Sequence, residues 1–222
     1  MVMSERGQYK ADVVLMGTGV RAESLLAKEA GINLGFKGSI AVDEKMLTNV
    51  PGVYAAGDCA ETYHLLLKEP SYIPLGTTAN KQGRVAGTNV AGGEAVFEGV
   101  VGTTITKAFG VGVAVTGLTE KAAEQSGIIA RTVTIQHRTR AHYYPSPGPI
   151  HIKLVWNPQD GKLLGAQIAG PVLEAKRIDV FAMALNHGLT IEDLQRLDLS
   201  YAPPFAPVWD PILVAANVAA KG

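Results

Sequence analysis

A glycine and an aspartate that follow a short apolar segment form the clearest chemical signal in the chain. Residues 53–56, Val-Tyr-Ala-Ala, lead directly into Gly57 and Asp58. We expect this apolar segment, 53–56, to be a buried strand. Open α/β sheets bind ligands beyond the carboxyl ends of their strands, which is where Gly57 and Asp58 would lie. Gly57 would let a ligand approach the backbone, and Asp58 would offer a carboxylate to a sugar-like hydroxyl. The alternative is an ordinary strand followed by a turn.

The composition indicates a folded protein without an obvious nucleic-acid or membrane partner. The chain has 222 residues, of which 47% are hydrophobic and 18% charged, enough for a buried core in one or two domains. Twenty basic and twenty acidic residues cancel, which leaves no basic footprint for nucleic acid. No apolar stretch approaches the ~20 residues of a membrane span, and the N-terminus lacks a signal-peptide core. We therefore expect a cytoplasmic protein.

Cysteine and histidine usage predicts no metal site and no internal disulfide. Cys59 is the single cysteine, so the chain holds no Cys-x-x-Cys pair. A redox role is one reading of Cys59, and a small buried hydrophobe is the more common one. The five histidines lack i, i+4 spacing and nearby acidic or cysteine ligands, which argues against a metal centre.

The first hundred residues predict alternating strands and helices. A buried strand is expected over 11–19, a helix over 23–30, two further strands over 39–43 and 53–56, and a helix over 74–90. Small or apolar residues form a stripe along the last helix at positions 75, 79, 83, 86, 87 and 90.

The remaining residues predict an α+β region of antiparallel strands and helices. Strands are expected over 105–115, 129–137, 150–156 and 163–169, with a hairpin turn over 157–161. Helices are expected over 119–126, capped by Thr119; from Pro171, with an apolar face of Ile178, Phe181, Ala182 and Leu185; and from Thr190, with Asp193 completing a capping box.

Residues 48–58, Thr-Asn-Val-Pro-Gly-Val-Tyr-Ala-Ala-Gly-Asp, resemble the second FAD signature of the flavin-dependent pyridine nucleotide-disulfide oxidoreductases. In that family the aspartate holds the ribityl chain, so the resemblance implies that Gly57 and Asp58 bind FAD. It also implies that the helix over 74–90 points its N-terminus at the isoalloxazine, which would place the backbone near Thr78 and Ala79 at the flavin. The alternative is that this helix belongs simply to the core.

Three motifs of the family are missing from the chain. These are the Gly-x-Gly-x-x-Gly turn for the FAD pyrophosphate, a second such turn for the nicotinamide cofactor, and the redox cysteine near the N-terminus. The chain therefore resembles the C-terminal half of such an enzyme, with a partial α/β FAD/NAD(P)-binding domain over 1–103 and an α+β dimerisation domain over 104–222. The complete enzyme would use FAD and NAD(P)H, whereas we expect this chain alone to bind neither and to be inactive.

Two further segments indicate the branch of the family. Residues 176–180, Lys-Arg-Ile-Asp-Val, and 200–205, Ser-Tyr-Ala-Pro-Pro-Phe, resemble the coenzyme A-disulfide reductase, NADH oxidase and persulfide reductase branch. The His-Pro pair of the glutathione reductase branch is absent. The resemblance implies a coenzyme A-type thiol or disulfide as substrate. We expect Lys176 and Arg177 on a solvated helix face, with contact to a coenzyme A phosphate as the alternative.

In this branch, tyrosine hydroxyls from the partner subunit lie over the reactive sulfur. The matching positions are Tyr201 and one of Tyr143 and Tyr144, and the sequence does not decide between the last two. A phenol with a pKa of about 10 stays protonated near neutrality and can donate a hydrogen bond to a departing thiolate. Phe205 would contact the cofactor from the same loop as Tyr201. The alternative is that these aromatic residues only pack the dimer interface.

Two functions of different classes follow. The first is the C-terminal portion of a flavin-dependent NAD(P)H oxidoreductase that reduces a coenzyme A disulfide, a persulfide or a related acceptor. The second is a catalytically inactive, homodimeric interaction module. Both predict a homodimer, for which the helix bearing Ile178 and Phe181 and the tail with Trp209 would supply apolar surface.

Overall fold

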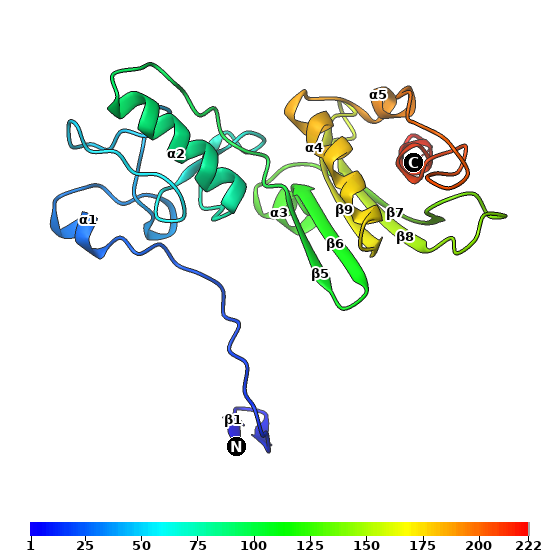
Figure 1. Cartoon of the computed structure of the whole chain (residues 1–222), viewed down its shortest axis with the longest axis horizontal. Helices are drawn as coiled ribbons and strands as arrows, with labels where there is room; N and C mark the ends of the chain where they lie inside the picture. The colour runs from blue at the N-terminus through cyan, green and yellow to red at the C-terminus, as the bar shows by residue number, and fades with distance from the viewer. Residues whose placement is uncertain (222) are drawn as a thin grey trace.

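The computed structural model describes residues 1–221, which form an irregular first part and a second part built on an antiparallel sheet (Figure 1). The helices are α1 (Leu25–Glu29), α2 (Gly76–Val90), α3 (Glu120–Gln125), α4 (Ile178–Asn186), α5 (Ile191–Gln195) and α6 (Pro211–Ala219), with short 3-10 turns η1 (Phe36–Gly38) and η2 (Glu174–Arg177). The strands are β1 (Val2–Ser4), β2 (Gly7–Tyr9), β3 (Thr62–His64), β4 (Glu69–Ser71), β5 (Thr104–Ala108), β6 (Val111–Gly117), β7 (Arg131–Arg138), β8 (Pro149–Trp156) and β9 (Leu163–Pro171). None of the described helices combines the length and apolar composition that crossing a membrane requires.

Five antiparallel strands form the sheet of the second part, in the order β5-β6-β9-β8-β7. Alternate residues of β8 are buried, starting with Ile150 and Ile152, because successive side chains of a strand point to opposite faces. Helix α4 packs on β6 and β9, and α6 packs on β7 and β8. Phe181 of α4 and Ile212 of α6 join Ile152 in one apolar core, and the predicted α+β fold is confirmed.

The helix caps predicted in the second part are confirmed. The Thr119 hydroxyl accepts the backbone N–H of Ala122 at 3.1 Å, and Thr190 forms a reciprocal capping box with Asp193. The prediction that Pro171 opens a helix is wrong, because Pro171 is the last residue of β9 and the helical chain begins at Glu174. A proline is tolerated at a strand end, where its missing N–H interrupts no further ladder bonds.

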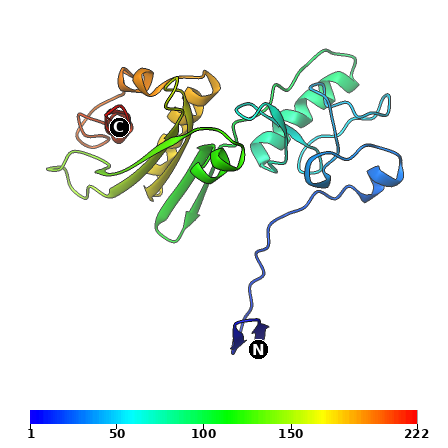
Figure 2. The ribbon, with the colours of Figure 1, turned by 180° about the vertical axis from the view of Figure 1, so that it is seen from behind.

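The buried strand predicted over 11–19 is wrong. These residues form no strand, and the side chains of Val13, Leu15 and Met16 are exposed. In both Figure 1 and Figure 2 the segment runs away from the rest of the chain towards the β1–β2 hairpin. A strand needs a neighbour for its backbone groups, and no other described segment pairs with this one.

The strands predicted over 39–43 and 53–56 are also wrong. They are reduced to isolated bridges, at Ile40 and at Tyr54. After Ile40 the chain turns instead of extending, because the Asp43 carboxylate accepts the backbone N–H groups of Lys45 and Leu47 at 2.8 and 2.9 Å. The helix predicted over 23–30 is confirmed as α1.

Helix α2 is confirmed, but it buries a different face from the predicted stripe. Gly83, Gly87 and Val90 are exposed. The buried residues of α2 are Thr78, Gln82, Ala86 and Asn89. Three of these four are polar, and two of them bind the loops that cover the helix. Gln82 accepts the Gly57 N–H at 2.9 Å, and the Asn89 side-chain nitrogen donates to the carbonyls of Lys45 and Ala95 at 2.9 Å each.

Candidate functional site

The turn at Gly57 lies directly against α2. Gly57 has a φ of +85°, a conformation that favours glycine, and a Cβ added to it would lie 3.5 Å from the Cβ of Ala79. Its backbone N–H donates to the side-chain oxygen of Gln82 at 2.9 Å. The structure thus brings together Gly57 and Ala79, which are 22 positions apart in the sequence and were both predicted to contact the cofactor.

Asp58 stands exposed at the end of this turn. Its backbone carbonyl accepts the Tyr72 hydroxyl at 2.9 Å, which fixes the turn from the side opposite Gln82. Burial raises the pKa of Tyr72, and the charges of Asp58 and Cys59 raise it further. Tyr72 therefore keeps the proton that this hydrogen bond needs, while the Asp58 carboxylate remains open to a ligand.

The first turn of α2 provides backbone N–H groups beside Gly57. No side chain caps this end of the helix, since the N-cap residue is Leu75. The N–H of Ala79 donates to the carbonyl of Leu75 at 2.9 Å, so that amide is already used. Thr78 is the third residue of the helix, where the backbone N–H has no partner within the helix. Of the two predicted positions, Thr78 offers the N–H and Ala79 packs against Gly57.

These residues fit a flavin cofactor. A glycine turn with positive φ, an exposed carboxylate and an uncapped helix N-terminus lie side by side. The carboxylate can accept hydrogen bonds from ribityl hydroxyls, and the helix dipole favours negative charge near its first turn.

Tyr143 and Tyr201 both line a second candidate site, a hollow of about 820 Å³ that also includes the end of β7. The two phenols are neighbours, and the interaction with Tyr143 is the main reason that the pKa of Tyr201 lies above its ordinary value. Tyr144 is half-buried and does not line the hollow. The structure therefore pairs Tyr201 with Tyr143, and not with Tyr144.

The tyrosine hollow, defined by Tyr143 and Tyr201, has basic walls. It is lined among others by His137, Arg138, Arg140 and His142, and by no acidic residue among those described. The His142 and Tyr143 rings stack edge to face with their centres 5.4 Å apart, which orients the Tyr143 phenol.

A hollow of the opposite charge lies in the first part of the chain. It encloses about 420 Å³ and is lined by four acidic residues, Asp43, Glu44, Glu61 and Glu98, together with apolar side chains. Among the described residues no cluster of histidine, cysteine and acidic side chains has the arrangement of a metal centre. Cys59 is half-buried, and its thiol donates to the carbonyl of Ala56 at 3.4 Å.

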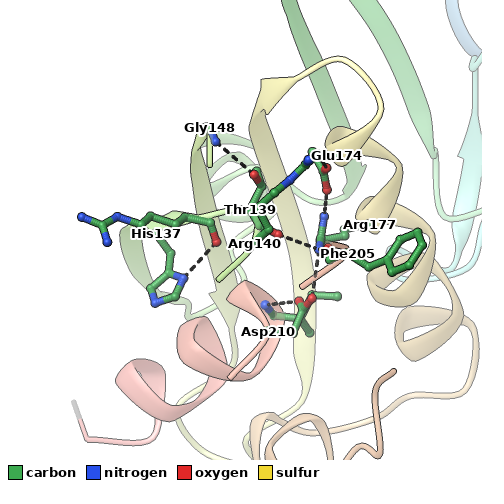
Figure 3. Close-up of polar contacts among 10 residues, drawn as sticks. His137, Thr139, Arg140, Gly148, Glu174, Arg177, Phe205 and Asp210 are labelled. Atoms are coloured by element: carbon green, nitrogen blue, oxygen red, sulfur yellow. Dashed lines mark hydrogen bonds and ion pairs between the residues drawn. The ribbon is translucent and has the colours of Figure 1, made fainter. Parts of the chain in front are cut away.

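Lys176 and Arg177 do not share a solvated face. Lys176 is exposed and forms an ion pair with Asp179, as expected. The Arg177 side chain is only 14% exposed and binds Glu174 and Asp210 (Figure 3), so the prediction of a solvated position is wrong for this residue. Arg177 is the last residue of the 3-10 turn that directly precedes α4.

The expected dimer surface also needs correction. Ile178 and Phe181 are at most 1% exposed because they belong to the core of their own chain. Exposed apolar side chains are found instead on the loop before α6, at Phe205, Val208 and Trp209, while α4 itself exposes Met183.

The comparisons with known proteins place the two parts of the chain in one family. Residues 1–92 match the profile described as pyridine nucleotide-disulphide oxidoreductase, and residues 103–211 match the dimerisation domain of the same family. The chain belongs to the pyridine nucleotide-disulphide oxidoreductase family. This confirms the family resemblance predicted from residues 48–58. The enzymes of this family depend on FAD and NAD(P)H.

Individual relatives of this family are similar over nearly the whole chain. It is 45% identical over 217 residues to the NAD(P)H coenzyme A polysulfide/persulfide reductase of Pyrococcus horikoshii. The aligned region covers 98% of this chain and 48% of that protein. It is 40% identical over 213 residues to the NADH oxidase of Methanocaldococcus jannaschii, over 96% and 47% of the two chains. The structure of an NAD-dependent persulfide reductase from A. fulgidus matches with a TM-score of 0.94 at 44% identity, over 98% and 41%. The chain spans about half the length of the curated relatives it matches.

Within one chain the structure separates the two groups of predicted site residues. Gly57 and Asp58 lie beside α2, whereas Tyr201 and Phe205 lie on the loop between α5 and α6, at the other end of the molecule in Figure 1. Phe205 is 72% exposed and has no contact with the Gly57 turn in its own chain.

Two residues that support the family's cofactor turn were missed in the sequence, Gln82 and Tyr72. Gln82 is four residues after Thr78, so the two share a helix face, and a glutamine on a buried face signals a hydrogen bond to loop backbone. No sequence signal marks Tyr72, because its role depends on the turn of the chain that brings it back to Asp58.

Proposed function

We propose that this chain forms part of a flavin-dependent NAD(P)H oxidoreductase that reduces a coenzyme A disulfide, a persulfide or a related sulfur acceptor. The observation that carries the proposal is that Tyr143 and Tyr201 line one hollow together with Arg138 and Arg140. A relative with 45% identity is named as a coenzyme A polysulfide/persulfide reductase, which supports the same substrate class.

The charge of the two hollows decides which one suits such a substrate. Coenzyme A carries several phosphate charges, so the four carboxylates of the hollow around Glu61 would repel it. The tyrosine hollow offers Arg138 and Arg140 instead. One terminal nitrogen of Arg140 lies 3.4 Å from Glu174, but its Nε is buried without a partner among the described residues. A buried donor of this kind is costly unless a ligand or water accepts its hydrogen bond.

The tyrosine pair would act on the departing sulfur. FAD, when bound, would pass two electrons from a reduced nicotinamide towards the substrate. Breaking a sulfur–sulfur bond with two electrons produces two sulfur anions, and the hydroxyl of Tyr201 would donate a hydrogen bond to the departing thiolate. Because the neighbouring Tyr143 raises the pKa of Tyr201, the phenol remains a donor across the physiological pH range. Tyr143 would hold the Tyr201 hydroxyl in position.

The separation of the two sites within one chain supports a homodimer as the working unit. The loop that carries Tyr201 and Phe205 would reach the cofactor-binding turn of the partner subunit. The exposed ring of Phe205 would contact the partner's cofactor. We place the boundary between the cofactor-binding and dimerisation domains at residue 103, where the loop after α2 leads into β5.

A fusion tests the proposed function. The part of the Pyrococcus horikoshii reductase that this chain does not cover would be joined to this chain. NAD(P)H consumption would be followed with coenzyme A disulfide, coenzyme A persulfide and cystine, a disulfide without phosphates. We expect turnover with the coenzyme A substrates and much less with cystine. A flavin-loaded fusion that reduces none of them, while the intact relative does, would contradict the proposal.

A further inference from the structure

Arg177 uses its guanidinium to connect three segments of the chain: its own 3-10 turn, the backbone at Thr139, and the loop before α6 (Figure 3). Its Nε donates to the Asp210 carboxylate at 3.0 Å, and one terminal nitrogen donates to Glu174. The other terminal nitrogen donates to two backbone carbonyls, that of Thr139 at 3.3 Å and that of Phe205 at 3.0 Å. Arginine suits this position because its planar group directs donors in several fixed directions, which a lysine cannot do.

The carbonyl of Thr139 belongs to the base of the loop that carries Tyr143. The Thr139 N–H donates to the carbonyl of Gly148 at 3.0 Å, and the Gly148 N–H donates to the Thr139 hydroxyl at 3.2 Å. These two bonds close residues 139–148 into a loop with a narrow base, and Arg177 binds that base.

The carbonyl of Phe205 belongs to the loop that carries Tyr201. The N–H groups of Phe205 and Ala206 both donate to the carbonyl of Ala202, at 2.9 and 3.0 Å, so a tight turn follows Tyr201 directly. The last residue of this loop is Asp210, which binds Arg177 through one carboxylate oxygen and caps α6 through the other by accepting the Ile212 N–H at 2.9 Å. Arg177 thus binds the loop that carries Tyr201 at two points, Phe205 and Asp210.

The surroundings of Arg177 keep it charged and fixed. Burial disfavours the charge of Arg177, but Asp210 and Glu174 outweigh burial and raise its pKa. Glu174 also accepts from Arg140, which lines the tyrosine hollow, so the same cluster reaches the basic wall of that hollow. Buried ion clusters of this type contribute specificity of geometry more reliably than net stability.

We propose that Arg177 is a positioning residue for the Tyr143–Tyr201 pair, because one guanidinium binds the base of the Tyr143 loop and the turn after Tyr201. The relevance of this positioning role to catalysis rests on the function proposed above. The pairing of the two hydroxyls is a property of this chain and is measurable without flavin or substrate, so its test is independent of the test of activity.

The test uses this chain labelled with fluorotyrosine, whose hydroxyl titrates at lower pH than that of tyrosine. Fluorine resonances of residues 143 and 201 would be assigned with Tyr143→Phe and Tyr201→Phe, and their titrations recorded in the unmodified chain, in Arg177→Lys and in Arg177→Gln. We expect the apparent pKa of residue 201 to fall towards that of free fluorotyrosine in both variants. The matched control is Lys176→Gln, which removes the neighbouring exposed charge and should leave the titration unchanged.

Circular dichroism and urea unfolding would show which variants fold. A folded Arg177 variant with the titration of the unmodified chain would overturn the proposal. If neither variant folds, Glu174→Gln and Asp210→Asn decide, since each loosens the guanidinium on one side and the amide oxygen of Asp210→Asn would still accept the Ile212 N–H. A lowered pKa of residue 201 in these two supports the positioning role, and an unchanged one in both overturns it.

Discussion

The side-chain oxygen of Gln82 accepts the backbone N–H of Gly57 at 2.9 Å, so a residue from the middle of α2 fixes the cofactor turn. The side-chain nitrogen of Gln82 donates to the carbonyl of Glu61 at 2.9 Å, on the other side of that turn. Gln82 is completely buried, and its two bonds connect the helix to both ends of residues 57–61.

Replacing Gln82 with methionine should therefore destabilise the protein more than a loss of packing would. Gln82→Met keeps the shape of the side chain but leaves the Gly57 N–H and the Glu61 carbonyl without their partners, at a cost of about 1–3 kcal/mol. Urea unfolding measures this change. Gln125→Met, at the exposed last position of α3, is the control and should change the free energy of unfolding by less than about 0.5 kcal/mol. Equal urea midpoints of unfolding for Gln82→Met and Gln125→Met would contradict this role of Gln82.

His64 should make the stability depend on pH. Its Nδ1 lies 3.2 and 3.4 Å from the backbone nitrogens of Leu66 and Leu67 and accepts their N–H groups, which requires the neutral ring. Burial lowers the pKa of His64 below its ordinary value of 6.5, although Glu69 and the backbone act in the opposite direction. The unfolded chain then binds more protons than the folded one, so the stabilisation is complete above pH 6.5 and is lost as the pH falls through the folded pKa.

Measuring the free energy of unfolding from about pH 8 down to about pH 5 tests this sign. His64→Asn supplies an oxygen acceptor that does not titrate, so its stability should fall less with decreasing pH than that of the unmodified protein. The control is His187→Asn, at an exposed position at the end of α4, which should preserve the original pH dependence. A His64→Asn variant with an undiminished acid-side slope would assign the effect to other groups.

This chain alone should purify without flavin and should not oxidise NADH. It contains no Gly-x-Gly-x-x-Gly turn for the FAD pyrophosphate, and the charge-assisted hydrogen bonds lost with it are worth about 1.5–3 kcal/mol each. Visible absorbance after gel filtration with added FAD is the measurement, and the fusion with the Pyrococcus horikoshii segment serves as the flavin-binding control. Stoichiometric flavin on the chain alone would contradict this prediction and show that the turn at Gly57 and α2 suffice to bind FAD.

The chain should form a dimer through its second part, with Trp209 at the interface. Trp209 is 57% exposed, and Phe205 and Val208 are exposed beside it in sequence. Trp209→Glu places a charge in this apolar surface, and loss of a central aromatic contact costs about 2–4 kcal/mol, or roughly 30- to 1,000-fold in affinity. Light scattering at micromolar concentration should then return a monomer. Phe109→Glu, in the exposed β5–β6 turn, should remain dimeric, and a monomeric unmodified chain would contradict the proposal.

The sequence predicts those features that depend on nearby residues. Thr119 and the pair of Thr190 and Asp193 cap helices as predicted, because a cap is set within three positions of the chain. The strand predicted over 11–19 fails, because an apolar segment becomes a strand only beside a neighbour.

The site required information that adjacent residues do not carry. Tyr143 and Tyr144 are chemically identical neighbours, and only the course of the 139–148 loop places the first of them at Tyr201. Lys176 and Arg177 likewise look alike as a charged pair, but Lys176 is exposed and pairs with Asp179, whereas Arg177 is largely buried and binds Asp210. In both cases the residue type does not distinguish the position from its neighbour, whereas the course of the backbone does.

The tyrosine pair gives the most direct prediction about activity in the fusion enzyme. Tyr201→Phe keeps the ring but removes a donor that acts mainly in the transition state, so kcat with coenzyme A disulfide should fall ~10- to 100-fold, with flavin content and dimerisation unchanged. Tyr143→Phe should lower kcat as well, and the double variant should lose less than the product of the two single effects because the two phenols interact in one hollow. Tyr144→Phe is the matched control, since Tyr144 lies outside the hollow. Unmodified turnover in Tyr201→Phe would restrict Tyr201 to packing the interface.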